Sequence, residues 1–216
     1  MKTVLLAGHA PAQNQAWIQE LQASGDWRIL GPVQSFGAAR VLLQRHHPDL
    51  LIAELRLIDG TALDMIRLLR VRLHDTSTQV LVVARGEGDL LLLDALQEGA
   101  DSFYDAADPK ADPLAVHAND TLAGGADIAP WIARRLLDHF ERRREVASSA
   151  VDELISPLAL SADEVLLLRL LARGRRLGDI AKSDRVAPRV LSARVRAIYR
   201  KMQWDLRAGD LSLLAA

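Results

Sequence analysis

The chain has 216 residues, of which 50% are hydrophobic and 25% charged, and its formal net charge is −1. This composition is typical of a soluble globular protein that is long enough for two domains. The absence of cysteine excludes a disulfide framework and a thiolate metal site, and it fits a reducing compartment, so we expect a cytoplasmic protein. No window reaches the roughly 18 uncharged apolar residues of a membrane-spanning helix, so we expect no membrane contact.

The first half of the chain predicts an α/β fold, a doubly wound five-stranded parallel sheet. Apolar runs and two weaker strands alternate with amphipathic segments. The expected strands are 4–7, 28–31, 50–53, 80–84 and 102–104, and the expected helices are 14–24, 35–46, 61–72 and 88–98. Runs that are apolar on both sides and separated by helices are typical of a parallel sheet covered on both faces. Because ligands of such sheets lie beyond the carboxyl ends of the strands, the positions of interest are 8–9, 54, 84 and 105–106.

Two segments of this half resemble the receiver domain of two-component response regulators. They read "HHPDLLIAELRLIDGTALDMIRLLR" (His46 to Arg70) and "QVLVVARGEGDLLLLDALQEGADSFY" (Gln79 to Tyr104). The later words "LAGGADIAPWIARRLLDHF" resemble the stretch that leads out of the receiver in the NarL/FixJ class. The resemblance implies a flavodoxin-like receiver domain over 1–124 and a linker helix within 125–150.

The same resemblance indicates that the phosphoryl chemistry of a receiver is lost. A working receiver has an acidic pair for Mg²⁺, an acceptor Asp, a Thr or Ser, and a Lys. The corresponding positions here hold Gly8 and His9, Glu54, Ala84, and Ala106. Magnesium needs hard oxygen ligands, which Gly8 and His9 do not provide, so we expect a pseudo-receiver with no metal and no cofactor.

Glu54 leaves two interpretations open. Its carboxylate either mimics a phosphorylated aspartate permanently or is a remnant that points to water at the strand end. The second is favoured, because with Ala84 and Ala106 in place no hydroxyl or ammonium would read the charge.

The charge of the chain is distributed unevenly. Residues 1–150 carry 15 Lys and Arg against 20 Asp and Glu, whereas residues 151–216 carry 12 against 8. Between Arg169 and Lys201 there are 11 basic and only 2 acidic residues. Such a local excess of positive charge is typical of a nucleic-acid-binding segment.

Three helices are expected in this basic region. Ser161 to Glu164 reads as a capping box that opens a helix over 165–172, and Gly174 can end that helix in the left-handed conformation. A short helix over 177–183 follows, and Pro188 suits the first turn of the third helix.

The third helix has two opposite faces. At about 100° per residue, the apolar side chains fall within an arc of about 60° and three arginines within about 40° on the far side. The apolar residues are Leu191, Val195, Ile198 and Met202, and the arginines are Arg189, Arg196 and Arg200.

This region resembles a LuxR-type helix-turn-helix domain, which we expect over 151–216. The resemblance is carried by "LSADEVLLLRLLARGRRLGDIA" (Leu160 to Ala181), by "VLSARVRAIYRKM", which ends at Met202, and by Arg207 ahead of "LSLLA", which looks like a fourth, supporting helix. Two departures weaken the helix starts by about 1 kcal/mol for each lost cap. Ala187 replaces the usual N-cap of the third helix, and Ala208-Gly209 replaces the usual Thr-Glu of the fourth.

The resemblance implies that the third helix lies in the major groove of double-stranded DNA. The base-facing positions are then Ser192, Ala193 and Arg196, flanked by Arg189 and Arg200. Arg196 is the best candidate for reading guanine. The candidate phosphate contacts are Lys182, Arg185, Arg194 and Lys201.

We therefore predict a DNA-binding transcriptional regulator, an atypical response regulator that is not controlled by Asp phosphorylation. The alternative is a protein-interaction or scaffold module that binds a partner through the receiver-like domain without sequence-specific DNA binding. No acid-base or nucleophile constellation indicates an enzyme. We expect a homodimer, with Leu90 and Leu91 as one candidate pairing surface, and a signal from a protein or small-molecule partner of the receiver-like domain.

Overall fold

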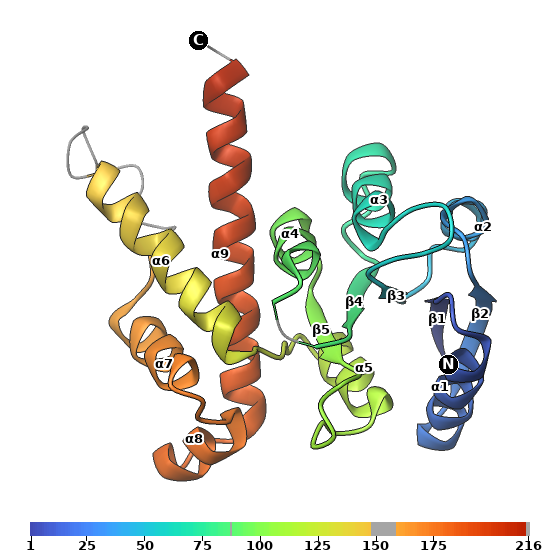
Figure 1. Cartoon of the computed structure of the whole chain (residues 1–216), viewed down its shortest axis with the longest axis horizontal. Coiled ribbons are helices and arrows are strands. Elements are labelled where there is room, and N and C mark those ends of the chain that lie inside the picture. The colour runs from blue at the N-terminus through green and yellow to red at the C-terminus, as the bar shows by residue number, and fades with distance from the viewer. Residues whose placement is uncertain (87, 148–158, 215–216) are drawn as a thin grey trace. The chain divides into compact units, whose positions relative to one another are not determined.

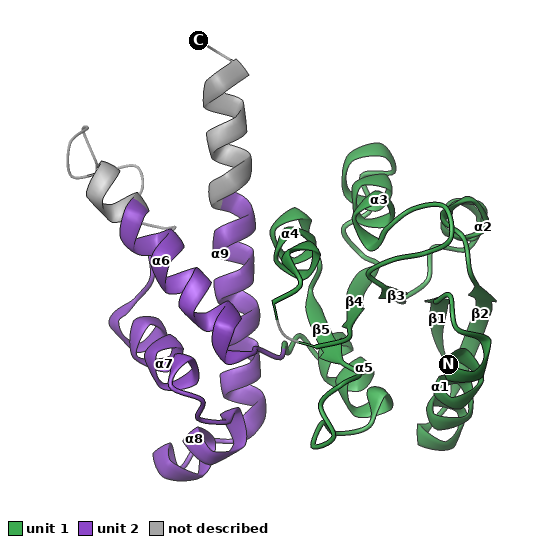
Figure 2. Ribbon diagram, viewed as in Figure 1, with its two compact units in different colours: residues 1–126 green, residues 127–216 purple. Residues whose placement is uncertain are grey.

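The computed structural model describes residues 1–86, 88–147 and 159–214. Side chains are described as far as residue 142 in the helix that ends at 147, and as far as residue 204 in the helix that ends at 214. The chain divides into two compact units, residues 1–126 and 127–216 (Figure 2). Among the described residues, no helix combines the length and the apolar character that crossing a membrane requires.

The first unit is a five-stranded parallel sheet in the order β2-β1-β3-β4-β5. The strands are β1 (Lys2–Ala7), β2 (Trp27–Val33), β3 (Leu50–Glu54), β4 (Gln79–Ala84) and β5 (Ser102–Asp105). The predicted fold class is confirmed, and all five expected strands are present. The three central strands are almost wholly buried, which explains why their sequences are apolar on both faces.

Helices cover both faces of this sheet (Figure 1). They are α1 (Pro11–Ser24), α2 (Phe36–His46), α3 (Ala62–Arg67), the π-helical turn η1 (Leu68–Arg72), α4 (Leu90–Glu98) and α5 (Leu114–Leu122). Helices α1 and α5 pack together on one face, and α2, α3 and α4 lie on the other. The sequence analysis did not predict α5, which is short and has no side-chain cap at its N-terminus.

The second unit is all helical, as predicted. It contains α6 (Pro130–Ala147), α7 (Ala162–Ala172), α8 (Leu177–Asp184) and α9 (Pro188–Leu214). A helix is present within 125–150, where one was expected: it is α6, which packs against α7 as part of this unit. The capping box at the start of α7 is confirmed, since the Ser161 hydroxyl accepts from the Glu164 amide at 3.2 Å and the Glu164 carboxylate accepts from the Ser161 amide at 2.6 Å.

The prediction of a separate fourth helix is wrong. Helix α9 continues without a break from Pro188 to Leu214. A new helix needs a chain break and an N-cap side chain, and Ala208-Gly209 supplies no such cap. The loss of that cap, which was expected only to weaken the start of a fourth helix, thus removes the start altogether.

Asp75 holds the turn between η1 and β4. Its carboxylate accepts from the amides of Ser77 and Thr78 at 2.8 and 3.0 Å and from both hydroxyls at 2.7 Å. Burial by itself would raise the pKa of Asp75, but hydrogen bonds from Thr78 and Ser77 favour the ionised form and hold the pKa well below its ordinary value of 3.8.

We predict that Asp75→Asn lowers the free energy of unfolding at pH 7 by about 1–2 kcal/mol, because a neutral amide accepts these bonds less well. Since the folded-state pKa of Asp75 is depressed, its contribution is fully present above the ordinary pKa and is lost as the pH falls below it. Thermal unfolding of both proteins at pH 7 and near pH 3 should therefore show a smaller difference at the lower pH. A difference that stays constant would contradict this account.

Candidate regulatory pocket and nucleic-acid interface

The predicted receiver positions meet at one edge of the sheet. Gly8 and His9 follow β1, Glu54 ends β3, Ala84 ends β4, and Ala106 follows β5. The Ala106 amide donates to the Ala84 carbonyl at 2.9 Å, and a Cβ on Gly8 would lie 3.4 Å from the Glu54 carboxyl carbon. The parallel strand order thus brings together the receiver positions that were predicted from the sequence.

Glu54 does not point to water, so that interpretation was wrong. Only 3% of the residue is exposed, and protein donors reach both of its carboxylate oxygens. Arg85 Nη2 donates to Oε1 at 2.6 Å, the His9 amide donates to Oε2 at 2.8 Å, and the His9 imidazole Nδ1 lies against the same oxygen. We call Gly8, His9, Glu54 and Arg85 the strand-end cluster. Arg85, which no sequence pattern singled out, comes directly after Ala84 and reaches back to Glu54.

The strand-end cluster does not suit a magnesium ion. Gly8 and His9 supply no carboxylate, and a guanidinium and an imidazole already engage Glu54. Asn14, from α1, fills the space beside Gly8: a Cβ on Gly8 would lie 2.5 Å from Asn14 Oδ1. The buried Asn14 amide donates to the Gly8 carbonyl at 2.7 Å. No cluster of three or more His, Asp or Glu that could hold a metal occurs in the described part of the chain.

Further acidic side chains form hydrogen bonds and an ion pair next to this cluster. Asp105 accepts from the Gly86 amide at 3.0 Å. Asp89 caps α4 through the Leu91 amide at 3.0 Å and pairs with Arg56, whose hydrogen bond holds the pKa of Asp89 below its ordinary value. Helix α4 therefore begins at a fixed place, with Leu90 60% exposed in its first turn and Leu91 half-buried.

We predict that Arg85→Ala lowers the free energy of unfolding by about 1–3 kcal/mol, because a buried carboxylate loses its charged donor. The double variant Arg85→Ala with Glu54→Gln should recover part of that loss, since no unpaired charge is then buried. Denaturant unfolding of the two variants, of Glu54→Gln and of the parent measures the coupling. Strictly additive effects would show that the pair does not stabilise the fold.

The second unit contains the expected helix-turn-helix. Residues 185–187 join α8 to α9, and Arg185 caps α8 with a left-handed φ of 55°. Basic side chains around these helices are exposed, as expected for a surface that meets phosphate. They are Arg173, Arg175, Arg176, Lys182, Arg185, Arg189, Arg194 and Arg200.

The apolar face of α9 is confirmed, since Leu191, Val195, Ile198 and Met202 are all buried. On the opposite side, Arg189, Ala193 and Arg200 are exposed. Of the three arginines that the sequence predicted on the far face of α9, Arg189 and Arg200 are thus exposed.

The expectation that Ser192 and Arg196 share the exposed face is wrong in this structure. Ser192 is 7% and Arg196 3% exposed. The buried surface of α9 is wider than its aliphatic residues indicate, because it includes Tyr199, which is fully buried and donates to the Asp127 carbonyl at 2.7 Å. Ser192, Arg196 and Tyr199 follow one another at helical spacing on a single stripe. Counting Tyr199 as a core residue would have predicted this wider face.

Lys201, which was expected to contact phosphate, is engaged inside the second unit. Its ammonium lies 2.6 Å from Glu164 Oε2 and donates to the Ala159 carbonyl at 3.0 Å. Burial would raise the pKa of Glu164, but the bond from Lys201 and the Ser161 amide outweigh it and lower the pKa. Lys201 thus ties α9 to the capped start of α7.

Known proteins resemble both units of this chain. No family model matches it. The probable transcriptional regulatory protein NarL of Mycobacterium tuberculosis is 24% identical over 97% of this chain and 91% of its own length. The transcriptional regulatory protein YdfI of Bacillus subtilis is 22% identical over 89% of this chain and 85% of its own length.

Solved structures show the same fold. A LuxR-family two-component response regulator from Aurantimonas aligns with 64% of this chain and 97% of its own, with a TM-score of 0.54 at 19% identity. RcsB from Salmonella enterica serovar Typhimurium, bound to the promoter rprA, aligns with 94% of this chain and 92% of its own, with a TM-score of 0.52 at 18% identity. The chain is therefore similar over nearly its whole length to transcriptional regulatory proteins, and its fold is that of solved response regulators of the LuxR family.

Proposed function

We propose that the protein is a DNA-binding transcriptional regulator whose receiver-like unit is not controlled by phosphorylation of an aspartate. Its homology with transcriptional regulatory proteins over nearly the whole chain supports the first part. The second part depends on one observation, which is that protein donors engage both oxygens of the buried Glu54 carboxylate.

This arrangement replaces the parts of a phosphorylation switch. A receiver that is switched needs an acceptor whose charge changes and donors that respond to the change. Here Glu54 stands in place of the aspartate that a receiver phosphorylates, and Arg85 and His9 already bind its carboxylate. We propose that Glu54 acts as a permanent phospho-mimic, with Arg85 reading its charge in place of the missing hydroxyl and Lys.

Incubation with acetyl phosphate and Mg²⁺, or with beryllium fluoride, should leave the mass, the oligomeric state and the DNA affinity of the protein unchanged. Glu54→Asp is the sharper variant, because it restores the acceptor but not the metal ligands, and it too should gain no mass. Intact-mass spectrometry, with a working receiver as positive control, checks both. The proposal fails if one phosphoryl group appears on residues 1–126 of the parent protein.

We propose that α9 is the recognition helix and that its exposed face contacts the major groove. Arg189, Ala193 and Arg200 lie on that face and are exposed. Ser192 and Arg196 are buried on the same side of α9 as Tyr199, so each would first have to become exposed in order to reach a base. The phosphate contacts in this proposal are Lys182, Arg185 and Arg194, all of them exposed.

We expect the regulator to act as a homodimer, because a pair of linked domains on two half-sites binds far more tightly than one small domain. The exposed Leu90 at the start of α4 stays the candidate pairing contact. A protein or small-molecule partner of the receiver-like unit would supply the signal.

We predict different losses for the two kinds of DNA contact. At a site selected from random duplexes, Arg189→Ala or Arg200→Ala should cost about 1–3 kcal/mol and relax base choice. Arg194→Ala should weaken binding to all sequences alike and reduce the salt slope by about 1. Fluorescence anisotropy at several salt concentrations measures both, with Arg45→Ala, an exposed residue of the first unit, as control.

Two outcomes would contradict these assignments. If all three variants lost specificity equally, the division into base and phosphate contacts would be wrong. If the parent protein bound no duplex even at low salt, the scaffold function would replace DNA binding.

A further inference from the structure

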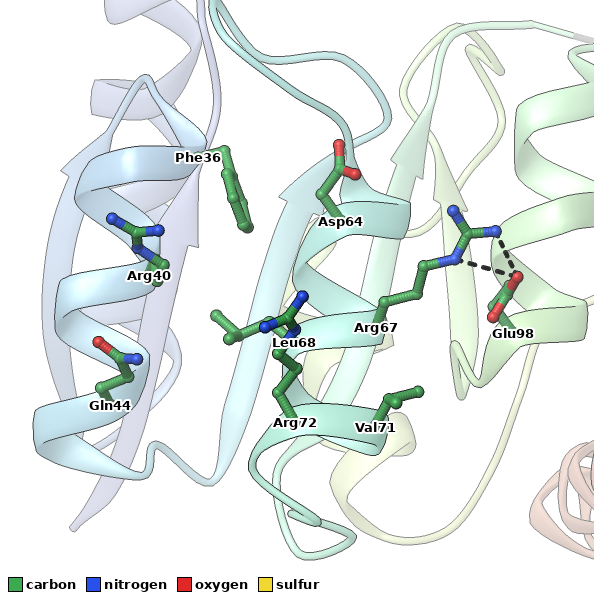
Figure 3. A pocket seen from close by; sticks show the side chains of 9 residues that line it. All are labelled: Phe36, Arg40, Gln44, Asp64, Arg67, Leu68, Val71, Arg72 and Glu98. Carbon is green, nitrogen blue, oxygen red and sulfur yellow. Dashed lines mark hydrogen bonds and ion pairs between the residues drawn. The ribbon is translucent and has the colours of Figure 1, made fainter.

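A groove lies between α2 and the segment formed by α3 and η1 (Figure 3). Its volume is about 590 Å³, which falls within the range of about 300–1,000 Å³ typical of small-molecule sites. None of the residues of the strand-end cluster lines it. The groove is therefore a separate feature of the receiver-like unit.

Three of the nine residues that line the groove are apolar. Phe36 contributes from the start of α2, and Leu68 and Val71 contribute from η1 on the opposite wall. Leu68 is buried, Phe36 is half-buried, and Val71 is 64% exposed. An apolar ligand body would remove this exposed surface from water.

The charges around this lining are only partly paired. Asp64 accepts from the Thr61 amide and hydroxyl, each at 2.8 Å, and Glu98 takes the Arg67 guanidinium at 2.6 Å. Arg40 on α2 and Arg72 on η1 have no hydrogen-bond or ion-pair partner among the described residues, and Figure 3 draws no interaction from either of them to another lining residue. The groove thus presents unpaired positive charge from both walls.

The wall that carries Arg72 is held rigidly from behind. Arg70, whose side chain is only 9% exposed, donates to the carbonyls of Asp75, Thr78 and Gly99 at 2.7, 2.9 and 3.2 Å. It also pairs with Asp101 at 3.1 Å. π-helical turns are frequent at functional sites, and this one turns Leu68, Val71 and Arg72 toward the groove. A fixed wall lowers the cost of ordering a bound ligand.

We propose that this groove binds a small organic carboxylate with an apolar body. The carboxylate lies between Arg40 and Arg72, since a planar guanidinium matches a carboxylate in two hydrogen bonds. The apolar body lies along Phe36, Leu68 and Val71. Inorganic phosphate would leave this lining exposed. The site gives the receiver-like unit an input that needs no phosphorylation, and only this last step rests on the proposed function.

Octanoate and octanol are a matched pair of probes, because they share the apolar chain and differ in the carboxylate. Amide and arginine side-chain NMR signals of the full-length protein, recorded without DNA, report the binding. We expect octanoate to shift the signals of Arg40, Leu68, Val71 and Arg72 saturably at millimolar concentrations. Octanol and inorganic phosphate should bind at least tenfold more weakly.

Variants of the two unpaired arginines show whether weaker octanoate binding comes from the lost charge or from misfolding. Arg40→Gln and Arg72→Gln should each weaken octanoate binding at least fivefold and leave the remaining NMR spectrum unchanged. Arg45→Gln is the matched control, since Arg45 is exposed on the same helix but does not line the groove. It should bind octanoate like the parent protein.

Several results would overturn the proposal. They are equal binding of octanoate and octanol, no saturable shift with octanoate, and equal effects of the Arg40, Arg72 and Arg45 variants. Because binding is measured without DNA, any of these results leaves the proposed DNA-binding function standing. Loss of DNA binding in the parent protein would likewise leave the groove untouched.

Discussion

The contact between the Glu54 carboxylate and the Arg85 guanidinium is the interaction on which the rest of this account depends. A carboxylate buried at a sheet edge needs a charged or hydrogen-bonding partner, because an unpaired charge in that place is costly. In the receivers that this unit resembles, a metal ion and a phosphoryl group meet at this edge. Here the chain supplies the partners itself, with Arg85 on Oε1 and His9 on Oε2. The strand-end cluster is thereby complete without a ligand.

Because both Glu54 oxygens already have protein donors, the proposed function needs an input elsewhere in the receiver-like unit. Asp105 binds the Gly86 amide and Asp89 caps α4, so the start of α4 is already positioned. In the proposed function the charge at this edge stays constant, because it comes from the Glu54 carboxylate and not from a phosphoryl group. The groove beside α2, in contrast, has positive charges without partners among the described residues. The proposed ligand groove and the strand-end cluster thus lie at different places in the same unit.

The sequence predicted the fold well, because local signals and burial agree in most elements. The apolar runs gave the strands, and the capping box at Ser161 marked the start of α7. What it could not predict depends on contacts between distant residues. The reach of Arg85 to Glu54 depends on side-chain packing, which the local sequence pattern does not reveal. The groove likewise depends on how the side chains of α2, α3, η1 and α4 pack together.

Binding of Mn²⁺, as a paramagnetic substitute for Mg²⁺, tests the central claim most directly. Amide NMR spectra of the full-length protein are recorded during the titration, with a working receiver as control. If Arg85 and His9 take the place of the metal, the signals of Gly8, His9 and Glu54 keep their intensity while those of the control's metal site disappear. Selective loss of these three signals at low Mn²⁺ concentration would contradict the account, because it would place a metal ion on Glu54.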